Sequence, residues 1–171
     1  MKRLILVALL VSVYACNGDD LEPYDPIAQL EIDLNLIDME LASTGQAVKL
    51  HTSGIRYFIE NEGEGVFPTE ADSVLTHYEI YTLDGELLDT SVEDVALANG
   101  IHSTSRDYDP FLFEIGTGVV IEGYEIGTKL LNKGAYGTFY VPSTLAYRSY
   151  GQSNIGPNQV LRIKIQLEDI L

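Results

Sequence analysis

The chain has 171 residues, of which 46% are hydrophobic and 21% are charged, and its 26 acidic and 10 basic side chains give a formal net charge of −16. This composition is typical of a globular protein with one core, and nothing in it requires two full domains. The scarcity of Lys and Arg excludes the basic surface that nucleic-acid binding needs, so no nucleic-acid partner is expected.

The first 15 residues have the pattern of a secretory signal peptide. Lys2 and Arg3 precede an apolar run that ends at Ala15, and Cys16, the only cysteine, follows directly. The run is shorter than the ~20 residues of a permanent membrane span. The segment VYAC resembles a bacterial lipobox, which implies cleavage before Cys16 and attachment of a lipid there. The alternative is an ordinary secreted protein with one unpaired cysteine.

Residues 16–25 are polar, acidic and rich in turn-forming residues, which predicts a tether between the lipid and the folded part. Cleavage also removes Lys2 and Arg3 and makes the net charge more negative, so membrane contact is expected through the lipid rather than through basic side chains. The expected location is the outer membrane, with the protein facing the periplasm or the cell surface.

An amphipathic helix is predicted over residues 26–44. Asp25 and Pro26 have the character of an N-cap and a first helical residue. The apolar residues that follow recur at spacings of three and four: Ile27, Leu30, Leu34, Ile37 and Leu41. One such stripe supports either packing on residues 45–171 or dimerisation, and packing is the favoured interpretation.

From Ser53 onward the hydrophobic period changes to two, which predicts half-buried strands. The clearest run alternates Leu161, Ile163, Ile165 and Leu167 with polar residues. Further strands are predicted at residues 55–59, 74–83, 111–115 and 135–141, with a turn at Asp84-Gly85. The only helical stretch expected among them is VVIEGYEIGTKLLNKG, residues 119–134. This order predicts an α+β domain in which an antiparallel sheet wraps around one short helix.

That helix contains Gly123 and Gly127, which weaken it as an isolated helix. We expect it to be stabilised by packing on the concave face of the sheet, where glycines allow a close approach of the two backbones. Val120 and Ile121 are then expected at the mouth between helix and sheet, with Tyr124 as a floor.

The sequence contains no common catalytic motif. His51, His77 and His102 are dispersed without metal-ligand spacing, and neither a nucleophile elbow nor a phosphate-binding glycine loop occurs. No metal or cofactor is therefore expected, and an apolar cleft is a better candidate site than a polar hydrolytic one.

Four segments, HYEIYTLDGELLDTS, PFLFEIGTGVVIEGYEIGTKLLNKG, FYVPSTLAYRSYG and NIGPNQVLRIKIQLEDIL, resemble in order and spacing the FKBP-type peptidyl-prolyl cis/trans isomerases. The N-terminal part is similar to that of FKBP-type lipoproteins of the Bacteroides group. The resemblance implies the FKBP fold and isomerisation of X-Pro bonds, without a cofactor, in proline-containing polypeptides of the envelope or in secreted proteins.

The resemblance also implies a pocket. It assigns catalytic roles to Asp89, Tyr147 and Tyr78, and it places the substrate against Leu88, Phe111, Val120, Ile121, Tyr124, Ile155 and Ile163. The Ile121 backbone N–H and the Tyr147 hydroxyl would bind ligand carbonyls, and Tyr124 would lie under the proline ring. From the residues alone, each apolar member can equally be core, and Asp89 can be a turn or bulge residue that caps a backbone N–H.

The chain departs from the family pattern at several positions. Tyr124 stands for the usual tryptophan, Leu88 for phenylalanine, Arg148 for glycine and Gly156 for the first proline of a pair. Because Arg148 disfavours positive φ, the loop after Tyr147 is expected to follow another path. Residues 92–109 form an insertion, interpreted either as a flap whose Val95 and Leu97 pack on the pocket rim or as a solvated excursion.

Two rival functions from other classes stay open. One is a binding or chaperone module of low or no catalytic activity that keeps the fold to hold proline-containing segments. The other is a structural lipoprotein of an envelope complex.

Overall fold

The structure is a computed structural model that describes residues 23–171. The predicted signal peptide, Cys16 and most of the predicted tether lie outside the described residues. The elements are, in chain order, α1 (Pro26–Thr44), β1 (Lys49–Leu50), β2 (Arg56–Asn61), β3 (Ser73–Thr82), β4 (Leu87–Thr90), α2 (Glu93–Ala98), β5 (Phe111–Glu114), α3 (Glu122–Lys129), β6 (Tyr136–Val141), the 3-10 helix η1 (Ser143–Leu145) and β7 (Leu161–Ile170).

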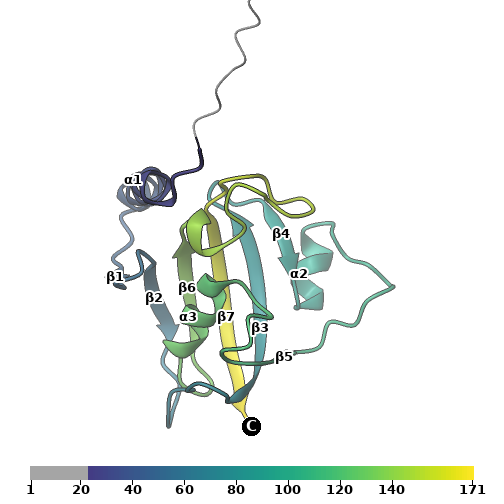
Figure 1. Ribbon diagram of the computed structural model, residues 1–171. Coiled ribbons are helices and arrows are strands. Elements are labelled where there is room, and N and C mark those ends of the chain that lie inside the picture. The colour runs from purple at the N-terminus through teal and green to yellow at the C-terminus, as the bar shows by residue number, and fades with distance from the viewer. Residues whose placement is uncertain (1–22) are drawn as a thin grey trace, which may run out of the picture.

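The strands form one antiparallel sheet in the order β1-β2-β6-β7-β3-β4, with β5 paired to the first half of β3 (Figure 1). The last strand, β7, lies between β6 and β3 over most of its length. Helix α3 lies across one face of this sheet, in front of β6 and β7 in Figure 1. The predicted α+β architecture, an antiparallel sheet around a short helix, is therefore confirmed.

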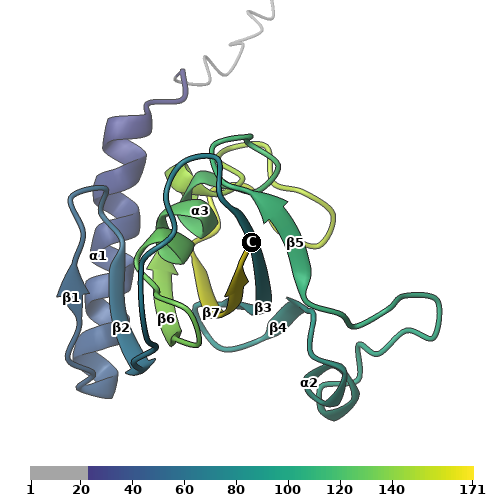
Figure 2. The ribbon, with the colours of Figure 1, turned by 90° about the horizontal axis from the view of Figure 1, so that it is seen from below.

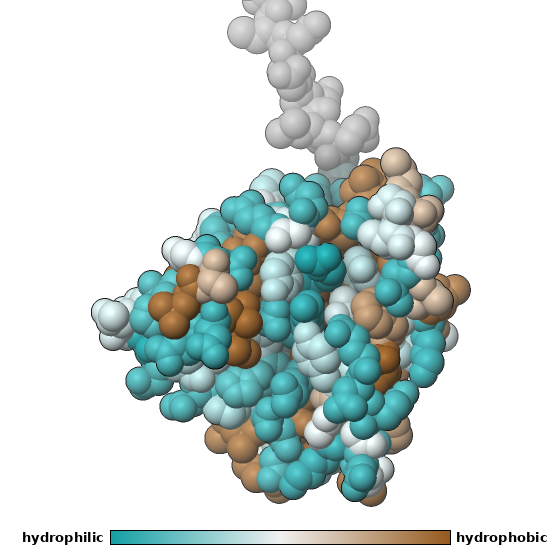
Figure 3. Space-filling model, turned by 180° about the vertical axis from the view of Figure 1, so that it is seen from behind, coloured by the Kyte–Doolittle hydropathy of each residue, from teal (hydrophilic) through white to brown (hydrophobic). Residues whose placement is uncertain are grey.

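The alternation in β7 decides which face of the sheet is core. Its residues Leu161, Ile163, Ile165 and Leu167 are all fully buried beneath α3, whereas Gln166 between them is exposed. The opposite face of the molecule is mostly hydrophilic, with apolar residues in separate small groups (Figure 3). A sheet with one wet face is the expected consequence of a strict period of two.

Helix α3 is shorter than the predicted 119–134. Val120 precedes it, and Ile121 is its N-cap. Its glycines lie against the sheet, as predicted. A Cβ added at Gly127 would lie 3.0 Å from the Ile165 side chain, and one added at Gly123 would collide with Val141. The two backbones can approach this closely only because these positions lack side chains.

Helix α1 occupies the predicted range and packs beside the sheet, running along β1 and β2 in Figure 2. The Asp25 carboxylate accepts hydrogen bonds from the backbone N–H groups of Ile27 and Ala28, at 2.8 and 3.3 Å. Ile37 and Leu41 form a second, smaller core with residues from the sheet and its loops: Tyr140, Val160 and, at the edges, Val48, Phe58 and Leu83. The expected packing of the helix on the following domain is thus observed.

Two expectations about helices are wrong. Ile27 was expected on the buried stripe of α1 but is 80% exposed, because the first turn projects beyond the contact that starts near Leu30. The insertion also contains the unexpected helix α2, which is only six residues long and has Ala96 as its one buried residue. Such a helix is too short to show a hydrophobic period. None of the helices within residues 23–171 is long and apolar enough to cross a bilayer.

Candidate functional site

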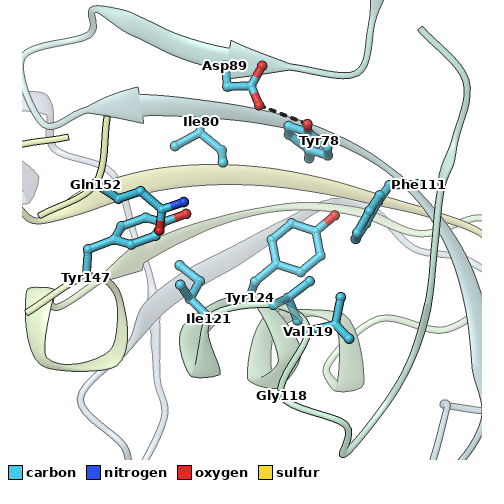
Figure 4. A pocket seen from close by; sticks show the side chains of 11 residues that line it. Tyr78, Ile80, Asp89, Phe111, Gly118, Val119, Ile121, Tyr124, Tyr147 and Gln152 are labelled. Atoms are coloured by element: carbon cyan, nitrogen blue, oxygen red, sulfur yellow. Dashed lines mark hydrogen bonds between the residues drawn. The ribbon is translucent and has the colours of Figure 1, made fainter. Parts of the chain in front are cut away.

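A cavity of about 430 Å³ opens between the start of α3 and the concave face of the sheet (Figure 4). This volume lies in the range of small-ligand sites. Its lining comes from β3, β4, β5, the segment leading into α3, α3 itself and the loop after η1: Tyr78, Ile80, Asp89, Phe111, Gly118, Val119, Val120, Ile121, Tyr124, Tyr147 and Gln152.

The floor of the cavity is the ring of Tyr124, which rises from α3 and is only 4% exposed. Its hydroxyl and that of Thr76 on β3 lie 2.7 Å apart and share a buried hydrogen bond. The rings of Tyr78 and Phe113 pack edge-on against it, with centroids 6.1 and 5.7 Å away. The floor is therefore fixed in place by packing on both sides and by one polar contact at its far end.

The carboxylate of Asp89 lies at one wall because β4 contains a bulge. Ile80 pairs with Asp89 and Tyr81 pairs with Leu87, so Leu88 is an extra residue that re-aims the strand. One oxygen of Asp89 accepts a hydrogen bond from the Tyr78 hydroxyl at 2.9 Å. The other accepts the backbone N–H of Thr90 at 2.8 Å, so the capping role considered for Asp89 is present as well.

A residue of the insertion completes this wall. The guanidinium of Arg106 donates to Asp89 at 2.6 Å and to the Tyr78 hydroxyl at 3.3 Å. Arg106 lies over the ring of Tyr108, which stacks on His102, and His102 in turn reaches Glu93 of α2 at 3.1 Å. The insertion is therefore an ordered arm. Its contact with the rim runs through Arg106. Leu97 is 56% exposed and Val95 is half-buried, and neither lines the cavity.

Tyr147 enters from the side opposite Phe111 (Figure 4). Its position depends on the turn that follows η1, in which Arg148 has φ 52°. Arginine thus takes the left-handed conformation that glycine would favour here, although its Cβ disfavours it. The expected difference in loop path from the family stays a prediction. The side chain of Arg148 donates to the Thr144 carbonyl at 3.2 Å.

The start of α3 supplies a backbone donor beside the apolar wall. The Ile121 carbonyl accepts the first bonds of the helix from Tyr124 and Glu125, at 3.0 and 3.2 Å. As an N-cap residue without a side-chain cap, Ile121 leaves the first N–H groups of the helix available for other acceptors.

The three tyrosines keep their protons at neutral and mildly alkaline pH. Burial raises the pKa of Tyr124, Tyr78 and Tyr147, and the negative charge of Asp89 raises the last two further. For Tyr78 the hydrogen bond from Arg106 acts in the opposite direction. Figure 4 marks a hydrogen bond between Tyr78 and Asp89 alone, so the Tyr147 hydroxyl makes none with the other lining residues and can donate into the cavity.

A family model described as FKBP-type peptidyl-prolyl cis-trans isomerase matches residues 64–168. The chain belongs to this FKBP family. It is 40% identical over 124 residues to the probable FKBP-type peptidyl-prolyl cis-trans isomerase FkpA of Neisseria meningitidis serogroup B, with 72% of this chain and 40% of the relative covered. It is 31% identical over 121 residues to the peptidyl-prolyl cis-trans isomerase Mip of Coxiella burnetii, with 70% and 46% covered.

The crystal structure of FkpA from Escherichia coli superimposes with a TM-score of 0.63 at 25% identity and covers 84% of this chain and 63% of that one. The FKBP fold expected from the sequence is therefore shown. The chain spans 40% of the length of the Neisseria relative, and the same share of the FkpA of Aeromonas hydrophila, to which it is 32% identical.

Seven of the ten residues that FKBP resemblance placed in the pocket do line the cavity: Tyr78, Asp89, Phe111, Val120, Ile121, Tyr124 and Tyr147. The other three do not. Ile163 is fully buried under the floor, while Leu88 and Ile155 are half-buried neighbours outside the lining. A fully buried Ile163 supports the floor and has no surface to offer a substrate.

The sequence did not predict four of the lining residues: Ile80, Gly118, Val119 and Gln152. Nor did it predict Arg106, which binds Asp89. Ile80 could have been found, because it lies two residues after Tyr78 on β3 and so faces the same side of the sheet. No sequence pattern identifies Arg106 as a site residue, because any polar side chain of the insertion could contact the domain.

Proposed function

We propose that the chain is a peptidyl-prolyl cis/trans isomerase that acts on proline-containing polypeptides of the cell envelope and on secreted proteins. The observation that carries this proposal is the cavity itself, which has a buried aromatic floor, apolar walls and a tyrosine hydroxyl directed inward. Membership of the FKBP family supports it.

The chemistry follows from the amide bond. Rotation about X-Pro meets a barrier of ~18–20 kcal/mol because twisting removes amide resonance. A twisted amide is less polar than a planar one, so an apolar, water-poor cleft favours it over the ground state, and each ~1.4 kcal/mol of this preference is worth tenfold in rate. In this proposal the proline ring lies on Tyr124, and the Tyr147 hydroxyl and the Ile121 N–H bind carbonyl oxygens of the client.

Asp89 and Tyr78 have a second role in the proposal. The Asp89 carboxylate is held by Tyr78, Arg106 and the Thr90 backbone, so its orientation is fixed before a client binds. A fixed negative charge beside the reacting bond acts through electrostatic preorganisation. No proton transfer is needed, since rotation about the amide neither makes nor breaks a σ bond.

The test is isomerisation of a short X-Pro peptide measured by NMR exchange with the full chain in detergent. We expect activity in the wild type, and a loss of about tenfold in kcat/KM for Tyr147→Phe and for Asp89→Asn, equal to about 1.4 kcal/mol each. Tyr150→Phe is the matched control, because Tyr150 is 89% exposed. Full activity in a folded Asp89→Ala, Tyr147→Phe double variant would contradict these assignments, and peptide binding without isomerisation would favour a binding module.

We also propose that Cys16 carries a lipid that anchors the chain to the outer membrane. The signal-like run before this sole cysteine supports the proposal. So does the name of a relative, the outer membrane protein MIP of Legionella longbeachae, which is 34% identical over 117 residues. Replacing Cys16 by serine should move the protein from the membrane fraction to the soluble fraction. If the serine variant stays with the membranes at the same apparent mass, the anchor lies elsewhere.

A further inference from the structure

The turn that delivers Tyr147 to the cavity is organised by one residue, Ser143, the first residue of η1. The Ser143 carbonyl accepts backbone N–H bonds from Ala146 at 3.0 Å and from Arg148 at 2.9 Å, so it holds the residues on both sides of Tyr147. The residue before η1 is Pro142, which has no side-chain acceptor and makes no cap. The amide of Ser143 therefore needs an acceptor from elsewhere.

That acceptor comes from α1, 110 residues earlier in the chain. One carboxylate oxygen of Asp33 accepts both the backbone N–H of Ser143 at 2.8 Å and its hydroxyl at 2.6 Å. The other oxygen accepts the side-chain amide of Gln29 at 2.8 Å. Asp33 and Ser143 are both fully buried.

Burying the Asp33 carboxylate costs desolvation free energy, because burial removes it from water. An apolar side chain would pack there without that penalty. Among the ion pairs of residues 23–171, none involves Asp33, so hydrogen bonds alone compensate its charge. We therefore attribute to the contact between Asp33 and Ser143 a role in fixing the geometry of η1 rather than in stabilising the fold.

The same turn is also held from the other side. Gly123 of α3 lies so close to it that an added Cβ would come within 3.2 Å of the Leu145 carbonyl. The turn thus lies between α3, which provides the floor of the cavity, and α1, which has no residue in the lining.

We infer that Asp33 is a positioning residue of the substrate site: it caps η1 from outside and thereby sets where the Tyr147 hydroxyl lies. The inference rests on the proposed function, since it assigns Tyr147 a contact with the client. It makes α1 a part of the site and not only a packing element.

The test compares Asp33→Ala, Asp33→Asn and Asp38→Asn in the full chain in detergent. Asp38 is the matched control, because it lies on the same helix and its carboxylate, 56% exposed, pairs with Arg56 at 3.1 Å and not with Ser143. We expect Asp33→Ala to lower kcat/KM by between about fivefold and about 100-fold at temperatures where it is fully folded, since small misplacements of a binding group have effects of this order. Asp33→Asn, which keeps one oxygen acceptor, should lie between Asp33→Ala and the wild type, and Asp38→Asn should match the wild type.

A second readout does not depend on catalysis. Hydrogen exchange of the Ala146 and Arg148 amides should accelerate in Asp33→Ala and not in Asp38→Asn, and the ring NMR signals of Tyr147 should shift. If the wild type lacks isomerase activity, the proposed function fails, and these signals still decide the positioning role. The inference is overturned if Asp33→Ala, folded, leaves the exchange, the ring signals and any kcat/KM unchanged, or if its loss of activity only follows the unfolded fraction.

Discussion

Burial gives the three tyrosines of the site, Tyr78, Tyr124 and Tyr147, a common dependence on pH. Each has a folded-state pKa above its ordinary value, and so has Tyr81 outside the site, where burial and the neighbouring Glu79 raise the pKa to about 12. A group with a raised folded pKa contributes stability that is fully present below its unfolded pKa and is lost as pH rises through the folded value.

The contribution of these tyrosines to the free energy of unfolding should therefore be level up to about pH 10, the ordinary tyrosine pKa, and then fall toward pH 12. Tyr124→Phe should decline less steeply over that range, although it is less stable at neutral pH because Thr76 loses its hydroxyl partner. Urea unfolding at a series of pH values measures both effects, and Tyr150→Phe serves as the exposed control. An unchanged slope for Tyr124→Phe would show that its proton is not linked to folding.

Arg148 offers a test of backbone strain at a single position. Its φ of 52° is unfavourable for a residue with a Cβ by roughly 1–2 kcal/mol. Arg148→Gly should raise the free energy of unfolding by about 0.5–1 kcal/mol, since glycine relieves this strain but has a more flexible unfolded state. Arg148→Ala is the control for the lost side-chain contact, because it removes the side chain and keeps the strain. Urea midpoints in which glycine does not exceed alanine would show that the conformation carries no strain.

Sequence reasoning found the pocket residues that belong to continuous motifs, such as Tyr124 and Tyr147, and missed those that act across the chain. Asp33 is the clearest case. It stands one helical turn before Ile37, on the buried side of α1, but a hydrophobic period counts apolar residues and passes over a buried acid. The role inferred for Asp33 follows only from its hydrogen bonds with Ser143, which is distant in the sequence.

At the scale of elements, the strands were predicted well because the sheet has one wet face, which imposes the alternation seen in β7. Of the helices, α1 was predicted at its observed bounds and α2 was not predicted. The cap at Asp25 fixed the start of α1, whereas α2 was missed because it is too short to show a period. The register shift in β4, which positions Asp89, has no signature in residues 87–90.

Helix α2 should act as the base of the arm that carries Arg106. Its one buried residue, Ala96, is fully covered, while the next residue, Leu97, is 56% exposed. Ala96→Asp should therefore displace α2, lower stability and weaken the pair between Arg106 and Asp89, because an unpaired charge cannot be buried there. Leu97→Asp has the same chemistry at an exposed position and should change stability by no more than about 0.5 kcal/mol.

Urea unfolding gives the stability of both variants, and the side-chain NMR signal of Arg106 reports its pairing. Isomerisation of a short peptide and refolding of a whole protein client can then be compared. If the arm selects clients, Ala96→Asp should alter client refolding more than peptide turnover. Equal effects of Ala96→Asp and Leu97→Asp on the Arg106 signal would rule out α2 as the base of the arm.

On the scale of the whole molecule, the net charge of −16 acts on stability through self-repulsion. Added NaCl shortens the Debye length to about 8 Å at 0.15 M and screens that repulsion. The urea midpoint should therefore rise between low salt and 0.15 M NaCl, even though the exposed ion pairs such as Lys133–Asp169 are weakened at the same time. A midpoint that falls with salt would mean that ion pairs outweigh the general repulsion.

The central place of β7 has a consequence for biosynthesis. The ribosome makes this strand after the other six described strands, yet the sheet needs it between β6 and β3 before the two halves can join. Asp33 likewise cannot bind Ser143 until the chain has been extended by a further 110 residues. Because non-local pairings form only after both partners exist, the pocket cannot assemble before residues 161–170 have been made and have paired with β3 and β6.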